Sequence, residues 1–302
     1  METRHYNIIG KKNIFLAISG ALVGFAVIFV LVFGFRQGID FTGGTLWQLK
    51  ESTLTAVGLQ EFFRTKLNLA DATAVFDSQS GSFLVRVPNL TEDDHQKDMQ
   101  LLRAAYPQIQ ELGFQSIGPS IGSELRRRAF IALALVLIGI SLYIAFAFRK
   151  VSKPVSSWKY GVITLITLFH DVLIPAGFLS ILGRFFGVEI DGNFMVALLV
   201  VMGFSVHDTI VVFDRIRENL ALDRGKTQFA TVINDSINQT LGRSVNTSLT
   251  LILVLLALLF VGPSALYYFV LTLLIGVTTG IYSSIFVANP LLLVWQGKAG
   301  KK

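Results

Sequence analysis

Cysteine is absent from this sequence of 302 residues, and charged residues are scarce. Without cysteine, no disulfide can stabilise a part of the chain outside a membrane, so such a part depends on its own apolar core. Charged residues make up only 15% of the sequence and hydrophobic residues 52%, a balance that excludes a soluble fold of this length. The composition predicts a polytopic membrane protein.

Six apolar stretches are long enough to cross a membrane as helices. They lie near 14–35, 129–148, 159–182, 193–213, 244–262 and 266–294. The first follows Lys11 and Lys12, as the apolar core of a signal peptide would, but it is too long for such a core and ends without a small-residue cleavage site. We therefore expect an uncleaved anchor in residues 1–36 and a bundle of five further helices in residues 123–302.

The net charge of +6 arises from basic residues in short connections between the spans. They gather in the N-terminal segment, in 149–159, in 214–243 and in the C-terminal tail, whereas 183–192 carries one basic residue and 262–265 none. The positive-inside rule then predicts cytoplasmic termini and an outer location for residues 37–122. Three arginines at 126–128 lie on the outer side, where they end a long translocated domain and the rule is weak. Membrane orientation accounts for the charge, so we expect no nucleic-acid partner.

Residues 37–122 form the only sizeable domain outside the predicted spans. Strand patterns cover 45–50, 72–76, 83–87 and 110–117, helical patterns cover 54–68 and 91–106, and Ser78–Gly81 reads as a hairpin turn. The order βαββαβ predicts a ferredoxin-like sandwich. We see no catalytic constellation in it and expect His95 to be solvated. The domain is therefore predicted to be a binding or moving part rather than an enzyme.

The fourth span contains an acid, Asp208, preceded by His207. A carboxylate in hydrocarbon costs about 2.5–3.5 kcal/mol, so it usually faces a partner or a water-filled path. The fifth span carries a polar stripe at helical spacing, formed by Arg243, Asn246, Thr247 and Thr250. Such a stripe faces protein or water, which makes Arg243 the predicted partner of Asp208. A change in their separation would alter the proton affinity of Asp208; the alternative is a permanent ion pair that fixes the helix register.

The third span contains His170 and Asp171, followed by Pro175. Proline has no N–H to donate to the carbonyl of Asp171, four residues earlier, so that carbonyl is freed beside a titratable side chain. We favour a functional role over a kink whose polar groups are satisfied within the bundle. With His207 and Asp208, the pair could bind a metal only if spans three and four met. We expect no metal site and no cofactor.

Two sets of small residues predict close helix packing, Gly20 with Gly24 in the first span and Gly276 with Gly280 in the sixth. The second set could pack within the chain or against another subunit. Residues 214–243 read as an amphipathic interfacial helix followed by a short connection. Its first residues, Asp214 and Arg215, are expected to be solvated or helix-orienting rather than catalytic.

Five motifs occur in order over nearly the whole chain, at matching positions in the predicted topology. They are Gly38–Thr45 with Asp40, Gly43 and Gly44; Gly118–Leu125 with Gly118, Gly122 and Glu124; His170–Asp171; His207–Asn219 with Asp214 and Arg215; and Ile237–Ser248. Together they resemble the SecF family, the smaller members of the SecD–SecF pairs of the bacterial Sec system, within the RND superfamily.

The resemblance implies a complex with a SecD-like subunit, giving twelve spans and two outer domains. Such a pair is thought to use the proton gradient of the plasma membrane to help pull preproteins through the SecYEG channel from the outer side. The resemblance also implies that Asp208 belongs to a proton path, with Arg243 as its partner. Many relatives have asparagine where this chain has His207. A histidine there could relay protons, but we favour a neutral hydrogen-bonding substitute for asparagine.

Other functions make different predictions. Half of an RND-type exporter of lipids or small hydrophobic compounds predicts a larger outer region with an apolar tunnel, usually duplicated in one chain. A passive assembly factor predicts that Asp208 is dispensable, which the cost of a buried acid makes unattractive. A membrane enzyme is the least favoured, because no nucleophile–base pair or metal-ligand cluster is visible beyond the two His–Asp pairs.

Overall fold

The computed structural model describes residues 5–77, 80–150, 155–223 and 226–299. Within these residues, six helices are long and apolar enough to cross a membrane, and they span Ile9–Phe33, Pro119–Ala147, Ser157–Phe186, Gly192–Asp223, Phe229–Val261 and Ser264–Gln296. A small antiparallel sheet lies between the first and the second. The predicted class, a six-helix membrane protein with one small α+β domain, is confirmed.

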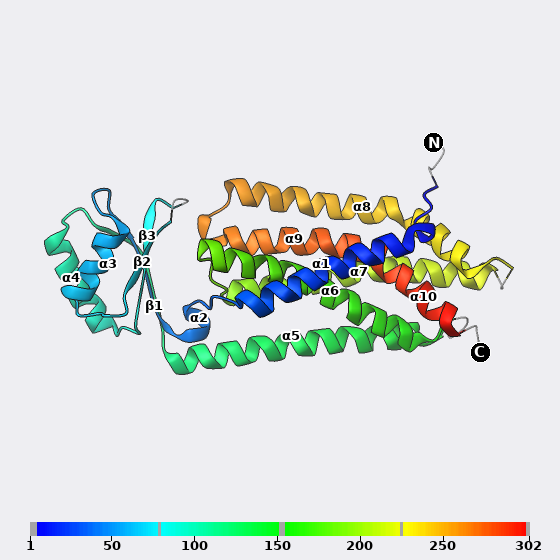
Figure 1. The fold of residues 1–302 in the computed structure, drawn as a ribbon, viewed down its shortest axis with the longest axis horizontal. Helices are drawn as coiled ribbons and strands as arrows, with labels where there is room; N and C mark the ends of the chain where they lie inside the picture. Colours follow the sequence, from blue (N-terminus) through cyan, green and yellow to red (C-terminus); the bar gives the residue numbers. More distant parts are fainter. Residues whose placement is uncertain (1–4, 78–79, 151–154, 224–225, 300–302) are drawn as a thin grey trace. The chain divides into compact units, whose positions relative to one another are not determined.

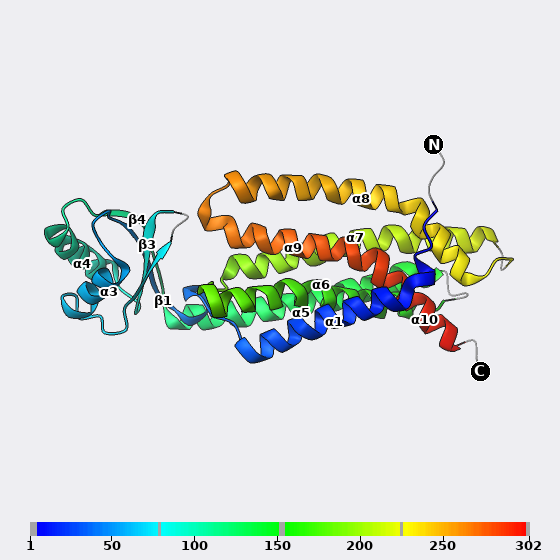
Figure 2. The same cartoon turned by 45° about the horizontal axis from the view of Figure 1, so that its top comes forward.

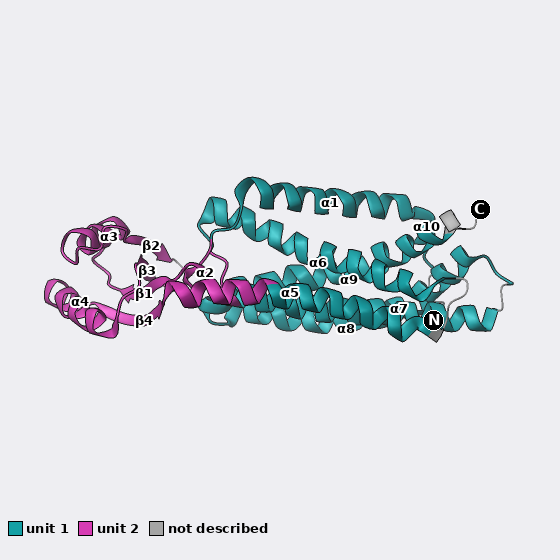
Figure 3. Cartoon of the chain, turned by 90° about the horizontal axis from the view of Figure 1, so that it is seen from below, with its two compact units in different colours: residues 1–36, 131–188, 193–302 teal, residues 37–130, 189–192 magenta. Residues whose placement is uncertain are grey.

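The chain divides into two compact units (Figure 3). The first comprises 1–36, 131–188 and 193–302, and the second comprises 37–130 and 189–192. The second unit therefore includes the start of the second membrane helix and the residues that lead into the fourth.

The first unit is a bundle of helices that run side by side (Figures 1 and 2). Its elements are η1 (Ile9–Lys11), α1 (Lys12–Phe33), the later part of α5 (Pro119–Ala147), η2 (Phe148–Lys150), α6 (Ser157–Phe186), α7 (Gly192–Asp223), α8 (Phe229–Val261), η3 (Ser264–Leu266), α9 (Tyr267–Ser283), the π-helical turn η4 (Ser284–Ala288) and α10 (Asn289–Ala299). Helix α6 contacts both α1 and α9, and α9 also contacts α8.

Small residues allow the closest helix approaches in the bundle, as expected where lipid removes the hydrophobic drive for association. A Cβ atom on Gly177 of α6 would lie 2.6 Å from the Cα of Ala26 in α1. On α9, a Cβ atom at Gly276 would lie 2.8 Å from Cγ1 of Val201 in α7. One turn further along α9, Gly280 faces Ser205 of α7 in the same way, with 3.0 Å to its Cβ. The small residues of the sixth span thus pack within the chain, against α7.

Gly20 and Gly24, in contrast, do not pack against another helix among the residues that the structure describes. Both are exposed, and a Cβ atom on either would meet no atom within 4 Å. Helix α1 turns a different side toward the bundle, on which Ser19 and Ala26 are buried. The predicted packing surface is therefore on the outside of the bundle, because Ser19 and Ala26 determine how α1 is rotated.

The second unit contains a four-stranded antiparallel sheet with two helices on one face (Figure 1). Its elements are α2 (Ile39–Thr42), β1 (Gly44–Lys50), α3 (Ala56–Thr65), β2 (Thr73–Asp77), β3 (Ser82–Val87), α4 (Glu92–Ala105), β4 (Gln110–Ile117) and the first turns of α5. The strand order β2-β3-β1-β4 is that of a ferredoxin-like sandwich. Ser78 and Gln79 of the predicted turn lie outside the described residues.

His95 belongs to the core of this domain, so the prediction that it is solvated is wrong. Its ring stacks on Phe114 with centroids 3.7 Å apart and packs edge-on against Trp47. Its Nε2 lies 2.9 Å from Oε1 of Glu111, and its Nδ1 lies 3.3 Å from Oε1 of Glu92. The imidazole packs as an aromatic ring while two carboxylates satisfy its nitrogens, which a polarity pattern does not detect. Hydrogen bonds from Gln96 and then from His95 lower the pKa of Glu92 below its ordinary value.

Two glycine-containing segments meet within the second unit. Gly43 and Gly44 have φ angles of 74° and 120°, in the region that favours glycine. A Cβ atom on Gly43 would lie 2.7 Å from the Cα of Pro119, and one on Gly122 would lie 2.7 Å from the nitrogen of Gly43. The motif after α1 and the motif that begins α5 are thus in direct backbone contact.

We expect Gly43→Ala to destabilise the protein by about 1–3 kcal/mol, because the methyl group would meet backbone atoms and the backbone conformation disfavours a side chain. Gly118→Ala is the matched control, since a Cβ atom there meets nothing within 4 Å and its φ is ordinary. Thermal unfolding of the two purified variants in detergent measures the difference. Equal midpoints would show that this backbone contact does not constrain the fold.

Candidate functional site

Asp208 lies on α7 with only 2% of its surface exposed. Its Oδ2 accepts a hydrogen bond of 3.0 Å from the hydroxyl of Ser248 on α8. Its Oδ1 lies 3.5 Å from Nδ1 of His207, whose side chain is 67% exposed. A buried carboxylate with so few donors is costly in its ionised form, so its protonation state depends on small changes around it.

Arg243 does not pair with Asp208, contrary to the prediction. Its side chain is exposed, and in the part of the chain that the structure describes it forms no ion pair with that carboxylate. The face of α8 turned inward carries Ser244 and Ser248, one turn apart. The stripe of Arg243, Asn246, Thr247 and Thr250 points away from the interior. Both rows have helical spacing, and the rotation of α8 in the bundle decides which of them meets α7.

A second carboxylate, Asp171 on α6, is completely buried. Its Oδ1 lies 2.8 Å from Nδ1 of His170, and its Oδ2 accepts hydrogen bonds from the hydroxyls of Ser205 on α7 and, at 2.7 Å, Ser283 on α9. Three helices thus meet at one side chain. Helix α6 continues through Pro175 to Phe186.

The two carboxylates are connected through α7. Ser205, which bonds to Asp171, precedes Asp208 by three residues, or about 4.5 Å of helix rise. Among the described residues, no three His, Asp or Glu side chains lie close enough together to hold a metal ion, so the two His–Asp pairs do not form a joint metal site. Two separate buried acids remain, each bonded to serine hydroxyls.

Two further motif residues, Asp40 and Glu124, make contacts near the starts of α7 and α5. Asp40 accepts a 2.8 Å hydrogen bond from the N–H of Gly192, the first residue of α7, and so caps that helix. Glu124, in the first turns of α5, forms ion pairs with Arg127 and Arg128. The Asp40 contact thus satisfies a backbone N–H at the start of α7, and the Glu124 pairs lie within α5.

Residues 214–243 do not form a separate interfacial helix, contrary to the prediction. Helix α7 continues without a break to Asp223, and α8 begins at Phe229, because apolar side chains of the two helices pack together beyond the membrane-length segments. Asp214 pairs with Arg217 on the exposed side. Arg215 bonds to Gln239 of α8 and to Glu218, which ties the two helices into a hairpin.

Sequence reasoning missed three serines, Ser205, Ser248 and Ser283, which supply hydrogen bonds to the buried acids. The available signal was their position at helical spacing within apolar stretches, where a hydroxyl needs a partner. Ser205 and Ser283 donate to Asp171, and Ser248 donates to Asp208.

Comparison with known proteins identifies the family. The family described as "Protein export membrane protein SecD/SecF, C-terminal" matches residues 97–298, and the SecD/SecF GG motif matches residues 28–50. Protein translocase subunit SecF of Thermobaculum terrenum is 45% identical and is aligned over 97% of this chain and 94% of its own. Protein translocase subunit SecF of Anaerolinea thermophila is 39% identical and is aligned over 96% of this chain and 94% of its own.

Solved structures give the same result. The crystal structure of SecDF from Thermus thermophilus, titled a translocon-associated membrane protein, matches 97% of this chain and 39% of its own, with a TM-score of 0.84 and 37% identity. SecDF in its super-membrane-facing form matches 98% of this chain and 39% of its own, with a TM-score of 0.70 and 36% identity. The motifs that resembled SecF are thus supported over nearly the full length, and the chain belongs to the SecF family of protein translocase subunits.

Proposed function

We propose that this chain uses the proton-motive force to promote preprotein translocation across the bacterial plasma membrane, as the SecF-like subunit of an accessory complex of the Sec translocase. The observation that carries the proposal is the burial of Asp208 on a membrane helix with one hydroxyl donor and an exposed imidazole beside it. A membrane potential supplies about 2.3 kcal/mol per charge for each 100 mV, so a few protons can drive a domain movement.

Proton binding at Asp208 changes the contact between two helices. An ionised Asp208 accepts the hydroxyl of Ser248, whereas the protonated acid has a hydrogen of its own to donate. The two protonation states therefore favour different arrangements of α7 and α8. Mechanical work is done if the conformation of the outer domain differs between these two arrangements. Helix α7 begins at Gly192, which Asp40 holds, so a shift of α7 would act directly on residues of the second unit.

The remaining polar groups have proposed places in the same path. His170 and Asp171 bind protons on α6, and His207 adjoins Asp208 at the bundle surface. In the proposed orientation both termini are cytoplasmic and residues 37–122 form the outer, moving domain. The N-terminal end of α7 is then its outer end, so Ser205 lies closer to the outer side than Asp208 does.

The proposed partner of the bundle is a SecD-like subunit. Relatives in which this chain matches 39% of a longer SecDF protein support such an association. The polar stripe of α8 supports a location for it, because Arg243, Asn246, Thr247 and Thr250 are exposed on a membrane helix and lipid is an unfavourable neighbour for them. A SecD helix covering the stripe would bring Arg243 into a protein interface. SecYEG and the preprotein are the further proposed partners.

Translocation in inverted membrane vesicles tests the proposal. Vesicles hold SecYEG with or without this chain and its SecD-like partner, and ATP-driven initiation is stopped before a gradient is applied. We expect the gradient to complete translocation only when both subunits are present, and a protonophore to abolish that completion. Equal completion with and without the protonophore would refute proton coupling.

A further inference from the structure

Two asparagine side chains near the start of α8 clamp the N-terminal segment that precedes α1. The amide of Asn238 donates to the carbonyl of Tyr6 at 2.9 Å and accepts the N–H of the same residue at 2.8 Å. The Oδ1 of Asn234 accepts the N–H groups of Ile8 and Ile9 at 2.9 and 3.2 Å, and its Nδ2 donates to the carbonyl that Asn238 also binds. Because all these bonds go to backbone atoms, they hold the path of the segment itself.

Apolar packing and α7 complete the hold on this part of α8. Ile8 and Ile9 are buried in the same apolar cluster as Ile233 of α8. From α7, the side chain of Asn219 donates to the hydroxyl of Ser236 at 2.8 Å. The first turns of α8 are therefore fixed both to the N-terminal segment and to the neighbouring helix.

Burial divides α8 into two parts, one on each side of Gly242. We call residues 229–241 the base of the helix and residues 243–261 its arm. The structure describes α8 throughout, and six residues of the base are buried but only three of the longer arm, two serines and a leucine. The base is thus well held, whereas few buried side chains keep the arm in place.

Gly242 itself is not required by packing. It is exposed, and a Cβ atom there would meet no atom within 4 Å. A glycine inside a helix weakens it, because its backbone has more conformational freedom than that of alanine. The hydroxyls of Thr240 and Thr247, on either side, each bond to the carbonyl four residues earlier, a pattern that bends helices. In Figures 1 and 2 the first turns of α8, in yellow, run at an angle to the rest of the helix.

Ser244 supplies an independent observation about the arm. Its side chain is buried, with 1% of the residue exposed, yet its hydroxyl has no hydrogen-bond partner among the described residues. Buried polar atoms are almost always paired, so an unpaired one needs an explanation. Ser244 is the first buried residue after Gly242, and a movement of the arm would give its hydroxyl new neighbours. The unpaired hydroxyl is thus the expected mark of an arm that has a second position.

We propose that α8 is a hinged helix, whose arm pivots at Gly242 on a base that the N-terminal segment and α7 hold in place. The bond of 3.0 Å from Ser248 to Asp208 is then a tether that keeps the arm against α7. The arm also carries the polar stripe that begins at Arg243, so the hinge determines where that stripe lies. The inference goes beyond the proposed function, because the hinge acts whatever force moves the arm.

Distances between spin labels, measured by pulsed electron paramagnetic resonance, test the hinge in the full chain reconstituted with its SecD-like partner in liposomes. The chain has no cysteine, so introduced cysteines label it only at the chosen positions. One pair, Val196→Cys on α7 with Phe260→Cys on α8, reports on the arm. The other pair, Asn13→Cys on α1 with Thr231→Cys on α8, reports on the base. All four positions are exposed. We expect a narrow distance distribution for the base pair and a broader one for the arm pair.

Substitutions then separate the hinge, the tether and the clamp. Ser248→Ala removes the tether and should broaden the arm distribution while the base distribution stays narrow. Gly242→Ala in the same chain should narrow it again, because alanine stiffens the helix. Gly203→Ala, at an exposed position of α7 with no atom within 4 Å, is the matched control and should leave the broadened distribution unchanged. Asn238→Asp keeps the acceptor for the N–H of Tyr6 but loses the donor to its carbonyl, and should broaden the base distribution.

An arm distribution that Gly242→Ala leaves unchanged in the Ser248→Ala background would overturn the hinge, as would a wild-type base distribution as broad as that of the arm. If the double variant does not fold, Gly242→Ala alone replaces it and has to narrow the wild-type arm distribution. An unchanged base distribution in Asn238→Asp would refute the part of the N-terminal segment in holding the base. None of these readouts involves translocation, so the proposed function can fail while the hinge stands.

Discussion

Asp208→Asn is expected to abolish the gradient-dependent completion of translocation while ATP-driven initiation continues at the wild-type rate. Asparagine has nearly the same shape as aspartate, and its amide oxygen can still accept the hydroxyl of Ser248. The helix contact is therefore kept and only proton exchange is removed. The measurement is the fraction of preprotein completed in inverted vesicles under an imposed gradient, compared with the same vesicles treated with a protonophore.

Asp214→Asn is the matched control for this experiment. The substitution is the same and lies on the same helix, but Asp214 is exposed and paired with Arg217 at 2.8 Å. An exposed pair contributes about 0–1 kcal/mol, so its loss should leave both stages of translocation unchanged. If Asp208→Asn behaves like Asp214→Asn, the buried acid is a structural group. The chain would then be better described as a passive assembly factor for its translocon partner.

The topology could be predicted from the sequence because membrane helices and a βαββαβ domain each have a strong, local signal. Stretches of about 20 apolar residues mark the spans, whatever packs around them. The domain's strands alternate and its helices have apolar faces, so even the order of elements is readable. These features depend on the chain's own periodicity. The structure places the elements of the small domain and the first, third and sixth spans within about five residues of the predicted bounds. The second helix begins about ten residues earlier than predicted, the fourth ends about ten residues later, and the fifth begins about fifteen residues earlier.

The detailed site could not be predicted because it depends on how each helix is rotated in the bundle. On α8, the row with Arg243 is the more polar, yet Ser248 is the residue that reaches Asp208. On α1, Gly20 and Gly24 form the more obvious small-residue pair, yet Ala26 is the residue that meets Gly177 of α6. In both cases the spacing identifies a row of side chains, and only the packing of neighbouring helices selects the row that faces inward.

The end of α7 illustrates a related limit. Charged residues from Asp214 onward suggest that the membrane helix stops, because they mark the transition to water. The structure continues the helix to Asp223, since Phe213 packs against Phe148 and Tyr160 and Ile216 is buried in the same apolar cluster. Polarity thus indicates where the membrane ends, whereas the length of the helix is determined by packing that extends beyond it.

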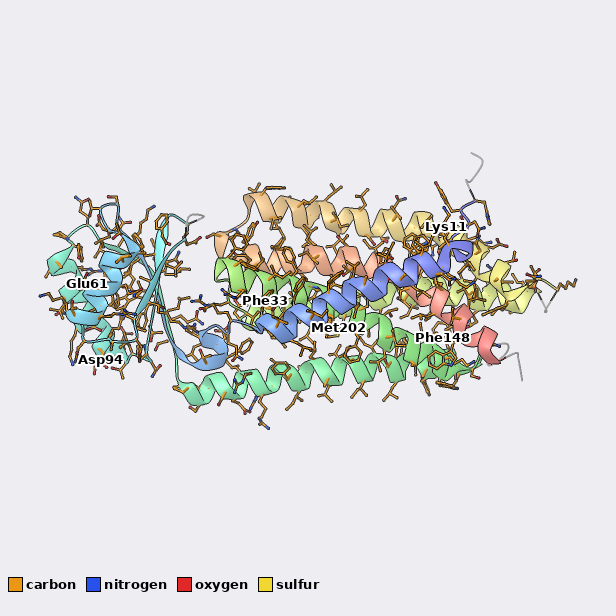
Figure 4. The ribbon with its side chains drawn as sticks, in the orientation of Figure 1. Lys11, Phe33, Glu61, Asp94, Phe148 and Met202 are labelled. Atoms are coloured by element: carbon orange, nitrogen blue, oxygen red, sulfur yellow. The ribbon has the colours of Figure 1, made fainter. Side chains whose placement is uncertain are left out.

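Gly276→Ala is expected to destabilise the bundle by about 1–3 kcal/mol, the usual cost of overpacking a well-filled interior. The added Cβ atom would lie 2.8 Å from Cγ1 and 3.1 Å from Cβ of Val201, which is fully buried and β-branched. Such a side chain has little freedom to move aside. The neighbouring residue on α7, Met202, which is labelled in Figure 4, is also fully buried.

A double substitution separates this clash from a general effect of changing a glycine. Val201→Ala removes the two methyl groups that the new side chain would meet, so Gly276→Ala combined with Val201→Ala should lose less stability than the sum of the two single changes. Gly203→Ala is the control, because it lies on α7 at an exposed position with no atom within 4 Å. Thermal unfolding of all four variants in detergent gives the comparison.

The same variant also tests how packing determines the polar cluster. Gly280 and Ser283 follow Gly276 on α9, and Ser283 donates to Asp171 at 2.7 Å. If α9 is pushed away from α7, one carboxylate can no longer accept hydroxyls from both helices at once. We therefore expect Gly276→Ala to reduce gradient-dependent translocation, and Val201→Ala to restore part of it in the double variant. Strictly additive losses would mean that α7 and α9 are not held together at this glycine.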